Sequence, residues 1–209
     1  MKDVRQEIIE YLEAEVLPRY DKFDKGHQQS HARSVMSQAL ELSGYYDVDP
    51  EMILVAAAFH DTGLSVCRET HHLESGKIIR TDKELGKWFT SRQIEIIAQA
   101  AEDHRASLDH DPRTIYGKII AEADRLIDAE TVIRRTIQFG LKRYPELDKE
   151  GHWSRMVEHL KEKYAEGGYL KLWIPESPNA ASLQKLRDVI SDGKELRECF
   201  ERIFAEENK

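Results

Sequence analysis

Hydrophobic residues recur every three or four positions along most of the chain, which is the spacing of one face of an α-helix. In residues 2–18, the side chains of Val4, Ile8, Leu12 and Val16 share one face, and Pro18 is expected to end that helix. Residues 20–26 are expected to form a loop. The pattern then predicts helices over about residues 28–43, 51–60, 71–81, 92–104 and 112–128, and further helix to about residue 140.

Residues typical of helix ends flank these segments. Asp49 is expected to cap the third helix, Thr70 the fourth and Ser91 the fifth, because their side chains can accept a hydrogen bond from a free backbone N–H. Gly63 suits the C-terminal stop of the third helix. A last helical region is expected from Ser177 to the C-terminus, with a break near residues 192–193.

Strand patterns are scarce, and residues 169–174 are the one candidate. The sequence therefore predicts an all-α fold. We expect a compact core of about five to seven helices over residues 20–130, with helices appended over about residues 140–209. The whole chain, residues 1–209, is expected to be a single domain.

Composition narrows the class of protein. The longest apolar run, residues 52–59, is too short to span a bilayer, and no apolar segment typical of a signal peptide stands at the N-terminus. A net charge of −8 argues against binding to nucleic acid or to an anionic membrane. The two cysteines, Cys67 and Cys199, are far apart, which argues against a disulfide framework and a zinc-thiolate site and indicates a cytoplasmic location.

Several ionisable residues fall on apolar helix faces. These residues are His27 and His31 on the second helix, His60 and Asp61 at the end of the third, and His72, His104 and Asp124 on later helices. Each one alone is typical of a hydrogen-bonded core residue. Burying all of them is costly unless something pairs them, and a divalent metal bound by imidazole and carboxylate would do so. His110, His152 and His159 lie outside this pattern and are interpreted as surface residues.

The ordered set of His31, the doublet His60-Asp61 with Gly63, and Asp124 resembles the HD-domain superfamily of metal-dependent phosphohydrolases. The resemblance covers about residues 20–130. It implies that His31, His60, Asp61 and Asp124 bind a divalent metal inside a helical core. Mn²⁺ is the favoured ion, with Mg²⁺, Fe²⁺, Co²⁺, Ni²⁺ and Zn²⁺ as alternatives, and one ion is favoured over two.

Three segments look like motifs of the small bacterial HD hydrolases, some of which cleave nucleoside triphosphates: residues 26–31, 68–75 and 101–105. Together with the metal ligands they suggest catalytic roles for Asp61, His72 and His104. His72 and His104 would contact phosphate or move a proton, or would hold a second metal with Asp61 as the bridge. His27, Arg68, His71 and Arg105 are candidate substrate contacts.

The expected activity is hydrolysis of nucleoside or deoxynucleoside triphosphates to a monophosphate and pyrophosphate by metal-activated water. The HD 5′-nucleotidases have a catalytic glutamate three positions after the doublet, where this chain has Leu64. A phosphodiesterase, a phosphomonoesterase and a non-catalytic nucleotide sensor stay open as alternatives, as does a purely structural role. The expected partner is a small phosphate substrate, and the protein is expected to be a monomer or a homodimer.

Overall fold

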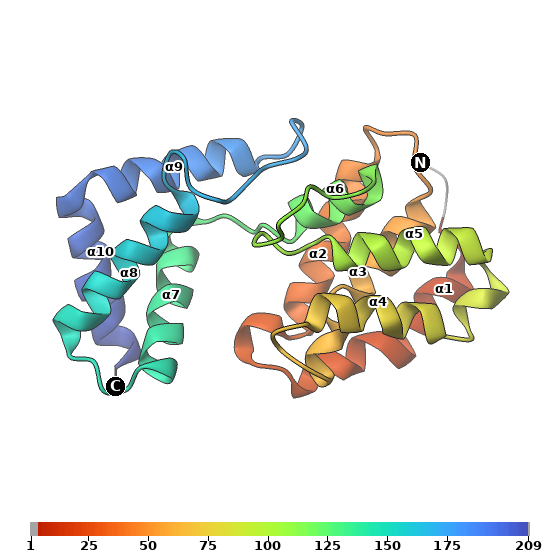
Figure 1. Ribbon diagram of the computed structural model, residues 1–209, viewed down its shortest axis with the longest axis horizontal. Helices are drawn as coiled ribbons and strands as arrows, with labels where there is room; N and C mark the ends of the chain where they lie inside the picture. Colours follow the sequence, from red (N-terminus) through yellow and green to blue (C-terminus); the bar gives the residue numbers. More distant parts are fainter. Residues whose placement is uncertain (1–3, 209) are drawn as a thin grey trace. The chain divides into compact units, whose positions relative to one another are not determined.

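The computed structural model describes residues 4–208, and all regular structure in that range is helical (Figure 1). The all-α prediction is therefore confirmed. The chain forms two compact units. The first runs up to Arg125 and includes Trp173–Ser177, and the second comprises Leu126–Leu172 and the chain from Pro178 onward. That the two units together act as one domain stays a prediction.

The first unit contains six α-helices among the described residues. They are α1 (Gln6–Tyr11), α2 (Gln29–Ser43), α3 (Pro50–Phe59), α4 (His71–Thr81), α5 (Ser91–Glu102) and α6 (Ile115–Ala123). Helix α3 packs against α2, α5 and α6, and every residue from Met52 to Phe59 is buried. This confirms the inference that a helix apolar on all sides lies in the core. Each large side chain buried there contributes roughly 1.5–3 kcal/mol to folding.

The N-terminal segment is not one continuous α-helix. After α1, Leu12–Val16 form a π-helical turn and Leu17–Lys22 a 3₁₀ segment, followed by another short 3₁₀ segment at Lys25–His27. Pro18 lies in the first turn of the 3₁₀ segment Leu17–Lys22. At that position its missing N–H breaks no helical hydrogen bond, so Pro18 is compatible with the start of this segment. The predicted loop over residues 20–26 is thus partly helical. Residues 2 and 3 of the predicted helix lie outside the described residues.

The predicted helix ends are confirmed in part. The Asp49 side chain caps α3 as expected, whereas Thr70 precedes α4 without a capping hydrogen bond. Helix α5 is capped by Thr90, one residue before the predicted cap, because Thr90 forms a reciprocal pair with Gln93. Helix α6 is shorter than predicted at both ends: Thr114 caps it, and Asp124 is its C-terminal capping residue.

Gly63 has a different role from the predicted helix stop. Gly167 is the single residue with a positive φ among those described, so Gly63 does not adopt the left-handed conformation. A Cβ atom at Gly63 would lie 2.0 Å from the carbonyl oxygen of His71 and 2.6 Å from the nitrogen of Ser75. Glycine is therefore needed because the start of α4 approaches this backbone closely.

The predicted strand at residues 169–174 is not formed, and the segment is irregular. The Trp173 N–H donates to the buried carboxylate of Glu122 at 2.7 Å, so its backbone pairs with a side chain and not with another strand. Ile174 is 3% exposed within the core of the first unit, and Tyr46 donates to Glu176. Residues 173–177, here named the return segment, thus complete the first unit beside α6.

The second unit contains α7 (Ala129–Arg143), α8 (Lys149–Tyr164), α9 (Asn179–Ser191) and α10 (Gly193–Glu207). Helix α7 packs against α8 and α10, and the predicted break before Gly193 is confirmed. The sequence pattern predicts His152 at the surface, but it is 3% exposed, with its ring centroid 5.7 Å from that of Phe204. That prediction is wrong because His152 faces the apolar interior of this unit.

Neither Cys67 nor Cys199 forms a disulfide, as expected. Within the described part of the chain, every helix is too short or too polar to cross a membrane.

Candidate metal centre

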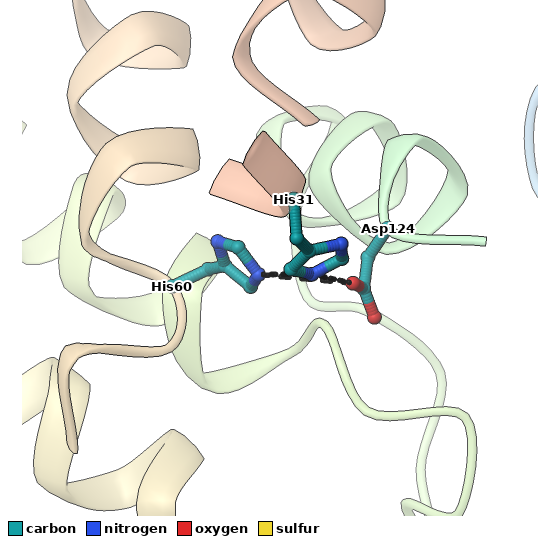
Figure 2. Close-up of side chains that lie close together, drawn as sticks. All are labelled: His31, His60 and Asp124. Carbon is teal, nitrogen blue, oxygen red and sulfur yellow. Dashed lines mark hydrogen bonds and ion pairs between the residues drawn. The ribbon is translucent and has the colours of Figure 1, made fainter. Parts of the chain in front are cut away.

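Three helices bring His31, His60 and Asp124 to one point (Figure 2). His31 lies in the first turn of α2, and His60 and Asp124 follow the last turns of α3 and α6. The Nε2 atom of His31 lies 3.3 Å from Nε2 of His60 and 3.1 Å from Oδ1 of Asp124. His60 Nε2 lies 3.7 Å from the same oxygen. Each of the three helix ends therefore supplies one side chain to this triad.

Asp61 joins this group through one of its two oxygens. Its Oδ2 atom lies 3.3 Å from Nε2 of His60 and 3.7 Å from Nε2 of His31. The structure therefore brings together all four residues that the sequence suggests as metal ligands. Three of the four are buried, with His60 at 0%, Asp61 at 2% and His31 at 8% exposure, whereas the side chain of Asp124 is 26% exposed.

A second group forms on the other oxygen of Asp61. The Oδ1 atom lies 3.4 Å from Nε2 of His71 and 3.5 Å from Nε2 of His104, and the two nitrogens are 3.1 Å apart. The sequence suggests only a substrate contact for His71. The sequence pattern favours its neighbour His72, which lies on the apolar face of this helix, but the orientation of the first turn of α4 brings His71 to Asp61 instead.

Three of these imidazoles are oriented by the same local contact. The Nδ1 atoms of His60, His71 and His104 lie 2.6–2.7 Å from the backbone carbonyl three residues earlier in the chain. A carbonyl oxygen only accepts, so Nδ1 carries a hydrogen, and in the neutral imidazole Nε2 presents its lone pair to the cluster. In metal sites this arrangement commonly orients histidine ligands.

The donor set fits a divalent metal. Imidazole Nε2 atoms and carboxylate oxygens face one another in both groups, and two such acceptors repel unless a cation or a proton lies between them. His31 Nδ1 is buried and has no hydrogen-bond partner in the described structure, so nothing there fixes its tautomer. Imidazole and carboxylate together suit Mn²⁺, Fe²⁺ or Zn²⁺.

Residues 29–128 match the family model of the HD domain. This segment of the chain is therefore similar to the HD domain. Members of this family are metal-dependent phosphohydrolases, and the matched segment includes both histidine–aspartate groups. Searches of curated proteins and of solved structures found no match.

Electrostatics at this site favour a positive charge between the histidines and the aspartates. Burial lowers the pKa of His60, but the charges of Asp61 and Asp124 outweigh burial and raise that pKa to about 9. Burial raises the pKa values of Asp61 and Asp124, but the neighbouring histidines outweigh burial and hold both well below the usual range. Both carboxylates are therefore ionised at neutral pH, and they attract a proton or a metal ion.

Asp61 is also positioned by Tyr20, a residue that no motif in the sequence marks. The Tyr20 hydroxyl accepts from the Asp61 N–H at 3.3 Å and donates to the Ala58 carbonyl at 2.8 Å. Tyr20 is fully buried, and burial together with the charge of Asp61 raises its pKa well above its ordinary value. Its hydroxyl thus stays protonated and fixes the backbone where α3 ends.

His72 belongs to neither of the two histidine–aspartate groups. Its Nδ1 atom lies 3.5 Å from Nη1 of Arg105, which also donates to the Glu69 carbonyl at 2.8 Å. Burial and the charge of Arg105 lower the pKa of His72 to about 4, so it is neutral at pH 7. The structure therefore places His72 with Arg105, apart from His104, with which the sequence-based hypothesis pairs it.

His27 and Arg68, two candidate substrate contacts, are linked by Asp24, which the sequence pattern does not single out. The Asp24 carboxylate lies 2.8 Å from Nδ1 of His27 and 2.5 Å from Nη1 of Arg68. Burial raises the pKa of Asp24, but hydrogen bonds from His27 and Arg68 outweigh burial and lower it to about 2. The two partners of Asp24 lie on segments that are far apart in the sequence, so neither helical periodicity nor a local motif marks Asp24.

Proposed function

We propose that this protein is a divalent-metal-dependent phosphohydrolase that cleaves nucleoside or deoxynucleoside triphosphates to a monophosphate and pyrophosphate. The observation that carries the proposal is the convergence of His31, His60, Asp61 and Asp124 within a segment similar to the HD domain. Such a set of mostly buried nitrogen and oxygen acceptors supports cation binding more strongly than it supports a purely structural role.

His31, His60, Asp124 and Oδ2 of Asp61 would hold one ion. The second group, His71, His104 and Oδ1 of Asp61, supports a second ion with Asp61 as the bridge, although the sequence favours one ion. Mn²⁺ is the ion we propose. When bound, it would polarise a phosphoryl group and make water a better nucleophile near neutral pH.

The remaining residues would bind and orient the substrate. Arg105, fixed by the Glu69 carbonyl, can donate to phosphate oxygens, and neutral His72 beside it can donate or accept one hydrogen bond. A chain with a net charge of −8 needs such local cations to attract a polyphosphate. Leu64, where HD 5′-nucleotidases have a glutamate, argues against a monophosphate as the substrate.

The test is a substrate panel. Protein stripped with a chelator and reloaded with Mn²⁺ is incubated with nucleoside triphosphates, deoxynucleoside triphosphates, monophosphates and phosphodiesters, and the products are identified by phosphorus NMR. Pyrophosphate plus a monophosphate supports the proposal. Orthophosphate from monophosphates, or cleavage of phosphodiesters alone, would assign one of the other hydrolase classes.

Two variants control this panel. Asp124→Asn keeps the side-chain size but removes one ligand charge, and it should abolish turnover. His110→Gln changes an exposed histidine outside both groups and should retain it. Saturable nucleotide binding by the wild type without any product would favour the sensor.

A further inference from the structure

The carboxylate of Asp24 accepts hydrogen bonds from donors on two separate loops. Its Oδ1 atom lies 3.0 Å from the Gly26 nitrogen and 2.8 Å from Nδ1 of His27, on the segment that precedes α2. Its Oδ2 atom lies 2.5 Å from Nη1 of Arg68, on the loop that precedes α4. Asp24 thus joins the two loops that lead into His31 and His71.

Both partners of Asp24 adjoin the candidate metal centre. The His27 ring lies 6.0 Å from the His31 ring, centroid to centroid. The backbone carbonyl of Arg68 accepts the hydrogen bond from Nδ1 of His71 that orients this imidazole. The chain of contacts therefore runs from one histidine–aspartate group through His27, Asp24 and Arg68 to the other.

Each partner of Asp24 keeps atoms that can contact a ligand. His27 uses Nδ1 for Asp24, and Arg68 uses Nη1, so Nε2 of the imidazole and Nη2 and Nε of the guanidinium are not occupied by this contact. The Arg68 side chain is 54% exposed and that of His27 is 30% exposed. A planar guanidinium is well suited to phosphate oxygens, and one that is already held in place loses less side-chain entropy on binding.

We propose that Asp24 is a positioning residue that holds His27 and Arg68 as a joint contact for the phosphates of the substrate that are not being cleaved. This inference rests on the proposed function. It adds a contact that the further phosphates of a polyphosphate can make and a simple phosphodiester cannot. Asp24 acts through its two partners and does not touch the reacting phosphorus.

The test compares Asp24→Asn with Asp21→Asn in the Mn²⁺-loaded protein. Asp21 is an exposed acid three residues away that contacts Gln29, so its variant loses the same charge outside this cluster. For Asp24→Asn, we expect KM for a nucleoside triphosphate to rise about tenfold and kcat to fall much less, because ground-state contacts are lost. KM for a bis-nitrophenyl phosphodiester should change less than about twofold in both variants.

Binding of inorganic tripolyphosphate, measured by titration calorimetry on the same Mn²⁺-loaded proteins, gives a readout without turnover. Its Kd should rise about tenfold in Asp24→Asn and stay within about twofold in Asp21→Asn. Arg68→Gln changes an exposed side chain and should weaken tripolyphosphate binding similarly. Adding Asp24→Asn to Arg68→Gln should then weaken binding by less than the two single effects multiplied.

The outcomes separate the two proposals. An unchanged Kd for tripolyphosphate in Asp24→Asn, or an equal rise of KM for the phosphodiester, would overturn the role of Asp24. If wild-type protein binds tripolyphosphate, loses that binding in Asp24→Asn, and yet cleaves neither substrate, the positioning role holds and the proposed hydrolase function fails.

Discussion

The Nε2 atoms of His31 and His60 face each other at 3.3 Å, and the Nδ1 atom of His60 is held by the Ala57 carbonyl. Because His60 donates through Nδ1, its Nε2 atom is an acceptor when the imidazole is neutral, and a proton or a metal ion must then lie between it and His31 Nε2. Asp124 and Asp61 add further acceptors to the same point. We therefore expect metal binding at this point to change the stability of the first unit.

Metal removal should lower the thermal stability of the protein. A divalent ion that binds the folded state at a free concentration of a hundred times Kd stabilises that state by about 2.7 kcal/mol, so Mn²⁺ added to chelator-stripped protein should raise Tm by several degrees. Asp124→Asn should show little of this increase. The measurement is differential scanning fluorimetry across a Mn²⁺ titration, with His110→Gln as the matched control. An equal Tm increase in Asp124→Asn would contradict the proposal that Asp124 binds the ion.

The neighbours His71 and His72 should differ in their effect on metal content. His71 faces Oδ1 of Asp61, whereas His72 faces Arg105. Equilibrium dialysis followed by elemental analysis should find two Mn²⁺ per wild-type chain and one in His71→Ala. His72→Ala should keep the wild-type content. Equal metal content in all three proteins would show that the second group does not hold an ion.

Gly63→Ala should destabilise the first unit strongly. The added Cβ would lie 2.0 Å from the His71 carbonyl, so backbone must shift, and overpacking of this kind costs about 1–3 kcal/mol or more. The control is Gly86→Ala, because a Cβ at Gly86 meets no atom within 4 Å. Urea unfolding of both variants in chelator measures the difference. A Gly63→Ala protein as stable as Gly86→Ala would show that the close approach is not present in solution.

The ion pairs of Asp24 should make stability depend on pH in the acid range. The folded pKa is lowered to about 2 from an ordinary value of 3.8, so the contribution is complete above pH 4 and is lost as pH falls through the folded pKa. For a partly exposed carboxylate it amounts to about 1 kcal/mol or less. The measurement is the free energy of unfolding of wild type and Asp24→Asn in chelator from pH 7 down to pH 2. Their difference should shrink below pH 4, and a constant difference would show that the charge of Asp24 has no part in it.

The helical class and most of the long helices follow from the amino-acid sequence alone, because a period of three to four residues is a local property. The buried position of α3 follows from the apolar run Met52–Phe59. The same periodicity places His31, His60, Asp61 and Asp124 on inward faces or at helix ends. Helix boundaries follow less closely: Thr90 and Thr114 cap α5 and α6, because the choice among adjacent polar residues depends on side-chain geometry.

Which polar residues meet depends on the packing of separate helices and loops. His71 and His72 differ by about 100° around the helix axis, and the packing of α4 against Gly63 determines which imidazole reaches Asp61. Tyr20 and Asp24 each contact one partner more than thirty residues away in the sequence, Ala58 and Arg68 respectively. Periodicity reports which face of a helix is buried, but contacts between loops arise only in the tertiary structure, and no local pattern encodes them.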